Sequence, residues 1–242
     1  MRVVLLVLVL FVGCMFMEPL VIDDFTVGAN DQSIEITLSK DLIITDNPII
    51  QNSYLSQAGS SASLLGEERD MEVKVQSGLS KRQFSSDIFR VTNNQFPAEW
   101  AVSNPKTSIA TYSIQYDGMD QSFSLDIDGL GGVNLLDYGD SLMLYVYTNY
   151  HCSLSVMMFS SNGAVCTANV KASYTVYDGH SYYVPLKSFE GSCSFTDIGA
   201  IQVDLVADDS TFCCSNNGNC FNFQTFCYSN TICISSSSYQ QR

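Results

Sequence analysis

From Ile34 onward, apolar and polar residues alternate with a period of two in several short segments of the chain. This alternation puts every second side chain on one face of an extended strand, so it predicts half-buried β-strands. Pairs such as Asp117-Gly118 and Asn162-Gly163 mark turns between them. The alternating segments are residues 34–38, 71–75, 109–116, 142–147, 154–159, 172–177 and 201–206.

Short strands without helical segments between them predict an all-β protein, an antiparallel β-sandwich or barrel. We expect residues 15–206 to form one domain. Long connections are expected at residues 41–64 and 77–105, the second carrying one or two short strands and Trp100. The side chains expected to point into the core are Ile36, Val73, Val75, Leu144, Val146, Val156, Ile201 and Val203.

The N-terminal segment has the pattern of a secretion signal, with Arg2 followed by an apolar run over residues 3–12. We expect residues 1–14 to be a signal peptide and the mature chain to begin near Met15. An alternative is lipidation of Cys14 in a degenerate lipobox. No later apolar run is long enough to span a bilayer, so the sequence predicts a secreted, extracellular protein without a membrane span.

The chain is acidic, with 11 basic and 25 acidic side chains. Loss of Arg2 with the signal would leave 10 against 25, a formal charge of −15. Such a field repels nucleic acid, which excludes it as an expected partner. Solubility is the simpler explanation of the acidity, and divalent-cation binding is the more specific one.

Eight cysteines follow Cys14, and an even number behind a signal peptide predicts a disulfide framework. Residues 207–242 are rich in Cys, Ser and Asn, which predicts a small disulfide-stapled C-terminal appendage. Three cysteines precede residue 210 and five follow it, so complete intramolecular pairing requires a bridge between tail and body. The eight are Cys152, Cys166, Cys193, Cys213, Cys214, Cys220, Cys227 and Cys233.

Several short motifs in order along residues 22–206 resemble those of secreted surface proteins with a jelly-roll sandwich. The motifs are Ile22-Asp-Asp-Phe25, Leu64-Leu-Gly-Glu-Glu-Arg-Asp70, Tyr116-Asp-Gly118, Gly129-Leu-Gly-Gly-Val-Asn134 and Ile198-Gly-Ala-Ile-Gln-Val203. That sandwich is similar to carbohydrate-binding-module and galactose-binding-like folds. The resemblance implies a fold and no ligand-contacting residue, because fold does not determine function. Gly131 and Gly132 are expected to meet a demand for positive φ or close approach.

Most catalytic and metal chemistry finds little support. His151 and His180 are the only histidines, and no Gly-x-Ser-x-Gly elbow is present, so no catalytic residue is expected. Zinc spacing and a phosphate loop are missing as well.

Carboxylates cluster near turns at Asp117, Asp120, Asp126 and Asp128, with a further pair at Asp137 and Asp140. Turn formation explains this placement most simply, because Asp side chains hydrogen-bond their own backbone. A calcium site built from the first four is the functional alternative, since calcium prefers hard oxygen ligands from loops. Acid/base catalysis of glycoside cleavage is a third reading.

Exposed aromatic rings beside polar groups would support sugar binding. The candidates for that surface are Trp100, Tyr145, Tyr147, Tyr150, Tyr182 and Tyr183, although sheet packing is the commoner explanation for the tyrosines of residues 142–147. The sequence therefore favours a non-catalytic secreted or surface protein that binds carbohydrate or an extracellular-matrix component. The alternatives are a matrix protein assembled through its Cys-rich tail and, third, a glycan-acting hydrolase.

Overall fold

The structure is a computed structural model that describes residues 20–23, 32–39, 51–58, 64–78, 80–81, 83–90, 98–104, 108–148, 152–172, 180–207, 221–223 and 232–234. The expected signal peptide and Cys14 lie outside these residues. Within the described part of the chain, no helix has the length and apolar character needed to cross a membrane.

The first of two sheets has eight strands in the order β1-β15-β8-β14-β6-β5-β2, with β11 paired to the other edge of β8. Pairing is antiparallel except where β15 runs parallel to β1 and to β8. The strands are β1 (Leu20–Asp23), β2 (Gln32–Thr37), β5 (Gln83–Arg90), β6 (Ala98–Ser103), β8 (Ser141–Thr148), β11 (His180–Pro185), β14 (Phe221–Phe223) and β15 (Ile232–Ile234).

The second sheet has seven antiparallel strands in the order β12-β10-β9-β13-β7-β4-β3. They are β3 (Gln51–Ala58), β4 (Glu68–Ser77), β7 (Ile109–Tyr116), β9 (Cys152–Ser160), β10 (Val165–Ala172), β12 (Glu190–Gly191) and β13 (Ile198–Ala207). The helical elements among the described residues are three single 3₁₀ turns, η1 (Leu65–Glu67), η2 (Leu135–Asp137) and η3 (Leu186–Ser188).

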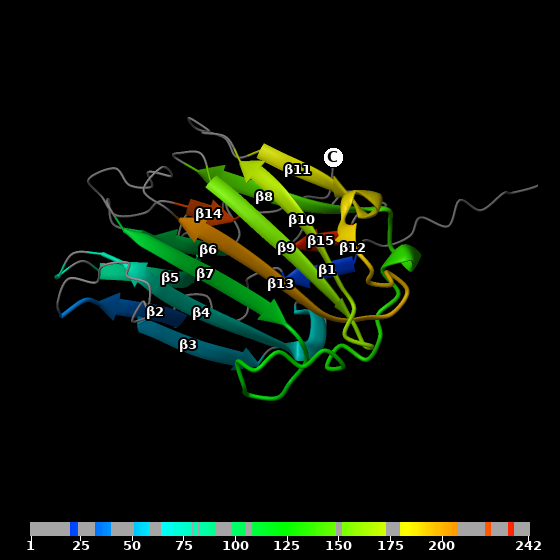
Figure 1. Cartoon of the computed structure of the whole chain (residues 1–242), viewed down its shortest axis with the longest axis horizontal. Coiled ribbons are helices and arrows are strands. Elements are labelled where there is room, and N and C mark those ends of the chain that lie inside the picture. Colours follow the sequence, from blue (N-terminus) through cyan, green and yellow to red (C-terminus); the bar gives the residue numbers. More distant parts are fainter. Residues whose placement is uncertain are drawn as a thin grey trace, which may run out of the picture.

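The two sheets form the layers of a β-sandwich-like fold, with β9, β10, β13, β7 and β4 in front of the first sheet in Figure 1. One apolar cluster contains buried side chains of both sheets. All eight side chains predicted to point inward are buried in this cluster, so the period-two reading of the core is confirmed. Gly131 and Gly132 have φ of 69° and 78°, as expected.

Strands with clear alternation match the prediction closely, and the others do not. Residues 51–58 were expected in a connection but form the edge strand β3, whose polar sequence needs no apolar face pattern. The 77–105 connection contains β5 and β6, which agrees with one or two strands there. The strand predicted at residues 172–177 lies almost wholly outside the described part, in which β10 ends at Ala172.

Two short segments of the predicted C-terminal appendage, β14 and β15, are strands of the first sheet beside β8, and the rest of residues 208–242 lies outside the described part. An edge of β8 offers unpaired backbone groups, and short tail segments satisfy them. One disulfide of the predicted framework is present among the described residues, between Cys166 and Cys193 with Cα atoms 5.2 Å apart. By parity, Cys152 is then the body cysteine left for the predicted bridge to the tail.

Candidate metal centre

Strand β4 is buried on both faces at its beginning, against the alternation expected of a sheet with one solvated side. Its inner face contributes Met71 and Val73 to the core, so Glu68 and Asp70 lie on the outer face. Both acidic residues are nevertheless buried. Their burial shows that the outer face is covered at this point.

The cover is the loop that follows β7, and hydrogen bonds from its backbone fasten it to β4. Both carboxylate oxygens of Glu68 accept from the N–H of Gln121 at 3.1 Å. Farther along, the N–H of Asp126 donates to Oδ2 of Asp117 at 2.9 Å. The loop is therefore closed over the acidic residues by the carboxylates themselves.

A close crossing of two glycines shapes the base of this loop. A Cβ added to Gly129 would lie 1.4 Å from the carbonyl oxygen of Asp117, and Gly118 has a φ of 91°. Neither position accepts a side chain without displacement of the backbone. The Asp-Gly pairs that the sequence offered as turns thus also allow one end of the loop to pack on the other.

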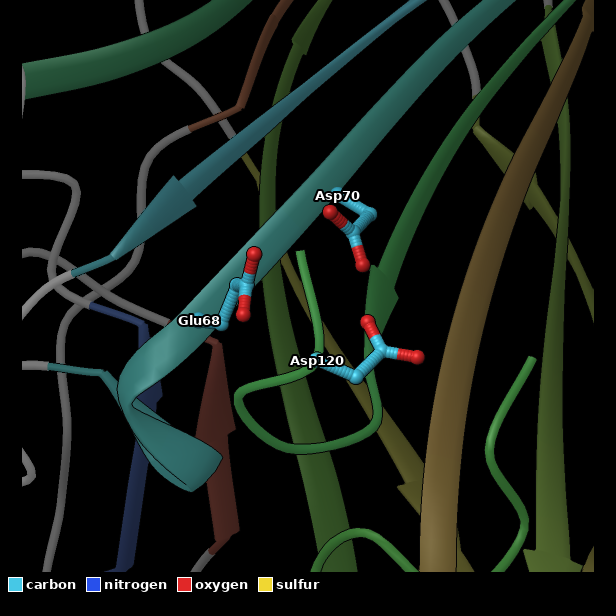
Figure 2. A group of neighbouring side chains, drawn as sticks. All are labelled: Glu68, Asp70 and Asp120. Carbon is cyan, nitrogen blue, oxygen red and sulfur yellow. The ribbon is translucent and has the colours of Figure 1, made fainter. Parts of the chain in front are cut away.

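Three carboxylates meet where the loop covers β4: those of Glu68 and Asp70, which are buried, and that of Asp120, which belongs to the loop and is exposed. One oxygen from each lies within 4.8 Å of the other two. Figure 2 shows Glu68 and Asp70 projecting from the same strand, with the carboxyl groups of Asp70 and Asp120 facing one another. Two oxygens bound about 2.4 Å from a single calcium ion are at most about 4.8 Å apart, so this spacing fits one coordination sphere.

A fourth carboxylate, that of Asp117, interacts with two of these residues, Asp70 and Asp120. The residue is 1% exposed, and its Oδ1 has no N–H or hydroxyl donor among the described residues. Burial raises the pKa of Asp117 to about 6. The charges of Asp120 and Asp126 contribute to this rise, whereas the hydrogen bond from the Asp126 backbone and the interaction with Asp70 oppose it.

The strand register explains why these residues converge. Asp70 lies opposite Gln115 in the antiparallel pair of β4 and β7, and continuing that register by two residues places Glu68 opposite Asp117. Gln115 is also buried, and its Oε1 has no hydrogen-bond donor among the described residues. Its Nε2 donates to Oε1 of Gln202 at 2.7 Å, which leaves the amide oxygen available as a neutral ligand.

Buried carboxyl groups at this spacing can be stabilised in two ways. A proton can be shared between Asp70 and Asp117, or a cation can bind to all of them. Carboxylate and amide oxygens are the hard ligands that calcium prefers, and there are enough of them to provide most of its six to eight positions. The donor set therefore fits calcium.

The predicted metal residues divide into two pairs. Asp120 belongs to the carboxylate cluster and Asp117 interacts with it, whereas Asp126 and Asp128 lie outside the cluster; Asp120, Asp126 and Asp128 are all exposed. Oδ1 of Asp126 accepts from the N–H of Asp128, and Oδ1 of Asp120 accepts from the N–H of Ser122, which is the turn-forming role that explains the placement of these acids most simply. Sequence reasoning missed Glu68 and Asp70. The available signal was the run Glu68, Asp70 and Glu72 on one face of a strand, in which only Glu72 has a basic residue next to it on that face, Lys74, with which it pairs.

Of the predicted aromatic surface, the structure describes the side chains of Trp100, Tyr182 and Tyr183. Trp100 is 1% exposed, and its indole N–H donates to Ser86 Oγ at 2.8 Å, so it is a core residue and the expectation of an exposed ring is wrong. Tyr182 packs on the core with an edge contact to His180, and Tyr183 on the same strand is 51% exposed. The side chains of Tyr145 and Tyr147, and all of Tyr150, lie outside the described part.

No protein-family model and no curated protein matches the chain. Among solved structures, one described as PfGH50B aligns with a TM-score of 0.36 and 10% identity, over 58% of this chain and 21% of its own. The enzymatically active domain of tailspike protein 4 of bacteriophage CBA120 aligns with a TM-score of 0.31 and 7% identity, over 71% of this chain and 18% of its own. This chain thus spans about a fifth of each. Both likenesses are weak, and no family is established.

Proposed function

We propose that this chain is a non-catalytic extracellular protein that binds calcium between β4 and the loop after β7. The supporting observation is the buried Oδ1 of Asp117, which lies beside other carboxylates and has no N–H or hydroxyl donor among the described residues. Glu68, Asp70, Asp117 and Asp120 are the charged ligands, and Gln115 adds a neutral one. Calcium neutralises the cluster and closes the loop on the sheet.

The proposal includes secretion and the jelly-roll arrangement. Secretion would place the protein where calcium is abundant. Successive strands change sheets repeatedly: β3 and β4 lie in the second sheet, β5 and β6 in the first, β7 in the second, and β8 in the first. Such alternation is typical of jelly rolls and supports that finer assignment.

Carbohydrate is the ligand class that the neighbouring surface favours. Gln115 donates to Gln202, and Nε2 of Gln202 donates to Oδ1 of Asp204 at 2.7 Å, which forms a polar track on the outer face of the second sheet. The contact between Gln115 and Gln202 crosses from β7 to β13, and adjacent strands are about 4.8 Å apart. This spacing suits polar groups that bind neighbouring sugar hydroxyls. Its acidic character disfavours anionic ligands.

The calcium site is tested by thermal unfolding of the metal-free protein with and without added calcium. We expect calcium to raise the melting temperature of the wild type and of Asp128→Asn, and to have no effect on Asp117→Asn. Asp128 is the matched control because it lies in the same loop outside the cluster. Equal shifts in all three proteins would contradict the assigned ligands, and no shift in the wild type would contradict calcium binding.

The carbohydrate proposal is tested on an array of neutral oligosaccharides in calcium and in EDTA. Gln202→Ala should lose glycan binding but keep the calcium-dependent melting shift. Asn169→Ala, on the same outer face at β10, serves as the control and should bind like the wild type. Glycan binding that survives Gln202→Ala would move the ligand to another surface.

Assembly through the Cys-rich tail has less support, because parts of that tail are strands of the first sheet. We expect Cys152 to form the bridge to the tail. Cys233 is an unsuitable partner, because it lies opposite Met143, near the start of β8. Cys220 is the better candidate, because it directly precedes β14, which starts opposite Thr148 at the end of β8 that leads to Cys152. Mass spectrometry of a non-reduced digest checks this, and intermolecular Cys152 peptides would favour assembly instead.

A further inference from the structure

The inner face of the same two strand segments carries a second charged group. Oδ2 of Asp23 in β1 accepts hydrogen bonds from Nη1 of Arg69 and, at 3.2 Å, from the hydroxyl of Tyr116. All three side chains are fully buried. Burial, and then the charge of Asp23, raise the pKa of Tyr116 well above its usual value, so its hydroxyl keeps the proton that it donates.

Residues of this inner network and residues of the cation site alternate along the chain. Arg69 lies between Glu68 and Asp70, and Tyr116 directly precedes Asp117. Side chains of consecutive strand residues point to opposite faces, so a shift of either backbone segment moves both groups together. The inner contacts therefore fix the positions from which the outer carboxylates project.

Charge connects the two faces as well. The carboxylate of Asp23 balances the guanidinium of Arg69, and both are removed from water. Without that balance, an uncompensated cation would lie directly behind the ligand carboxylates, where screening by solvent is weak. It would repel a bound calcium ion.

We infer that Asp23, Arg69 and Tyr116 are positioning residues for the calcium site, and that the N-terminal strand β1 is thereby coupled to cation binding. The inference rests on the proposed function. Because β1 belongs to the first sheet, the coupling crosses the sandwich from the outer face of the second sheet. Coupling of this kind is reciprocal, so calcium must also hold β1 in place.

Calorimetric titration of metal-free protein with calcium chloride tests the inference. Asp23→Asn removes the charge but keeps an acceptor for Tyr116, and we expect its Kd for calcium to be weaker by about fivefold or more. Val170→Ala is the control, a core truncation in β10 on the other side of the same sheet, and its Kd should equal that of the wild type. A purely structural role for Asp23 predicts the same Kd in both variants, which would overturn the inference.

Hydrogen exchange of the wild type gives a second test that does not depend on folding of a variant. Calcium should slow exchange of the amides of β1 by more than it slows those of β10. Equal effects on the two strands would overturn the inference while leaving calcium binding intact. If the wild type bound no calcium in the titration, the proposed function itself would fail, and the inference with it.

Discussion

The two faces of the paired segments 68–70 and 115–117 bury charge in opposite ways. On the inner face, Asp23 is matched by Arg69 and by the Tyr116 hydroxyl. On the outer face, the charged side chains that act on the pKa of Asp117 are all acidic, namely Asp70, Asp120 and Asp126. A buried charge must be neutralised by an opposite charge or by hydrogen bonds. The chain itself neutralises the charge on the inner face, whereas the outer face needs an external cation.

The comparison shows why burial alone does not identify a site. A buried ion pair has satisfied its charges and needs no ligand, and its main demand is that neither partner be removed. A group of buried carboxylates has a stability that depends on what the solution contains. Mutations in the inner network should destabilise the protein even without calcium, whereas the contribution of the outer cluster to stability should depend on calcium.

The largest effect is expected from Arg69→Met, which breaks the inner pair. Asp23 would remain buried without its counter-charge, at a cost of about 3–5 kcal/mol in the free energy of unfolding. Urea unfolding in EDTA should show this loss. A change below about 1 kcal/mol would mean that the inner face is not held by this pair.

A smaller effect of opposite sign is expected on the outer face from Asp117→Asn in EDTA. Burial is the main reason that the pKa of Asp117 is raised to about 6. The ionised form of this carboxyl group is therefore unfavourable in the folded protein at neutral pH. Its neutral amide should therefore stabilise the cation-free protein by about 1–3 kcal/mol. The same variant should be less stable than the wild type in calcium. Destabilisation in both buffers would show that Asp117 is a structural carboxylate only.

The smallest effect is expected from Tyr116→Phe, which removes the hydroxyl from Asp23 but leaves the Arg69 pair. Loss of one hydrogen bond to a charged group should lower the free energy of unfolding by about 1–2 kcal/mol. Chemical unfolding with and without calcium measures it. A loss as large as that of Arg69→Met would mean that the tyrosine, not the arginine, compensates Asp23.

Much of the fold could be predicted, because residues such as Val73 and Val203 alternate with polar neighbours, and alternation reports which face is buried. Edge strand β3 and the tail strands β14 and β15 lack that pattern. Short or polar segments join a sheet through backbone hydrogen bonds, and such pairing leaves little trace in the pattern of side chains along the sequence.

The site could be predicted only in part for a related reason. Asp117 and Asp120 follow a recognisable turn, but Glu68 and Asp70 lie about fifty residues earlier and meet them only through the register of β4 on β7. Trp100 is a residue that the sequence wrongly suggests for a binding site, because it is a large aromatic residue in an expected connection. It belongs to β6 and packs in the core.

A crystal structure of the protein grown in calcium tests the central claim most directly. We expect one ion bound by Glu68, Asp70, Asp117 and Asp120, with metal–oxygen distances of about 2.3–2.6 Å and the oxygen of Gln115 turned toward it. The account would be contradicted by a direct hydrogen bond between the carboxyl groups of Asp70 and Asp117 with no ion beside them, because a shared proton would then provide the compensation assigned to calcium.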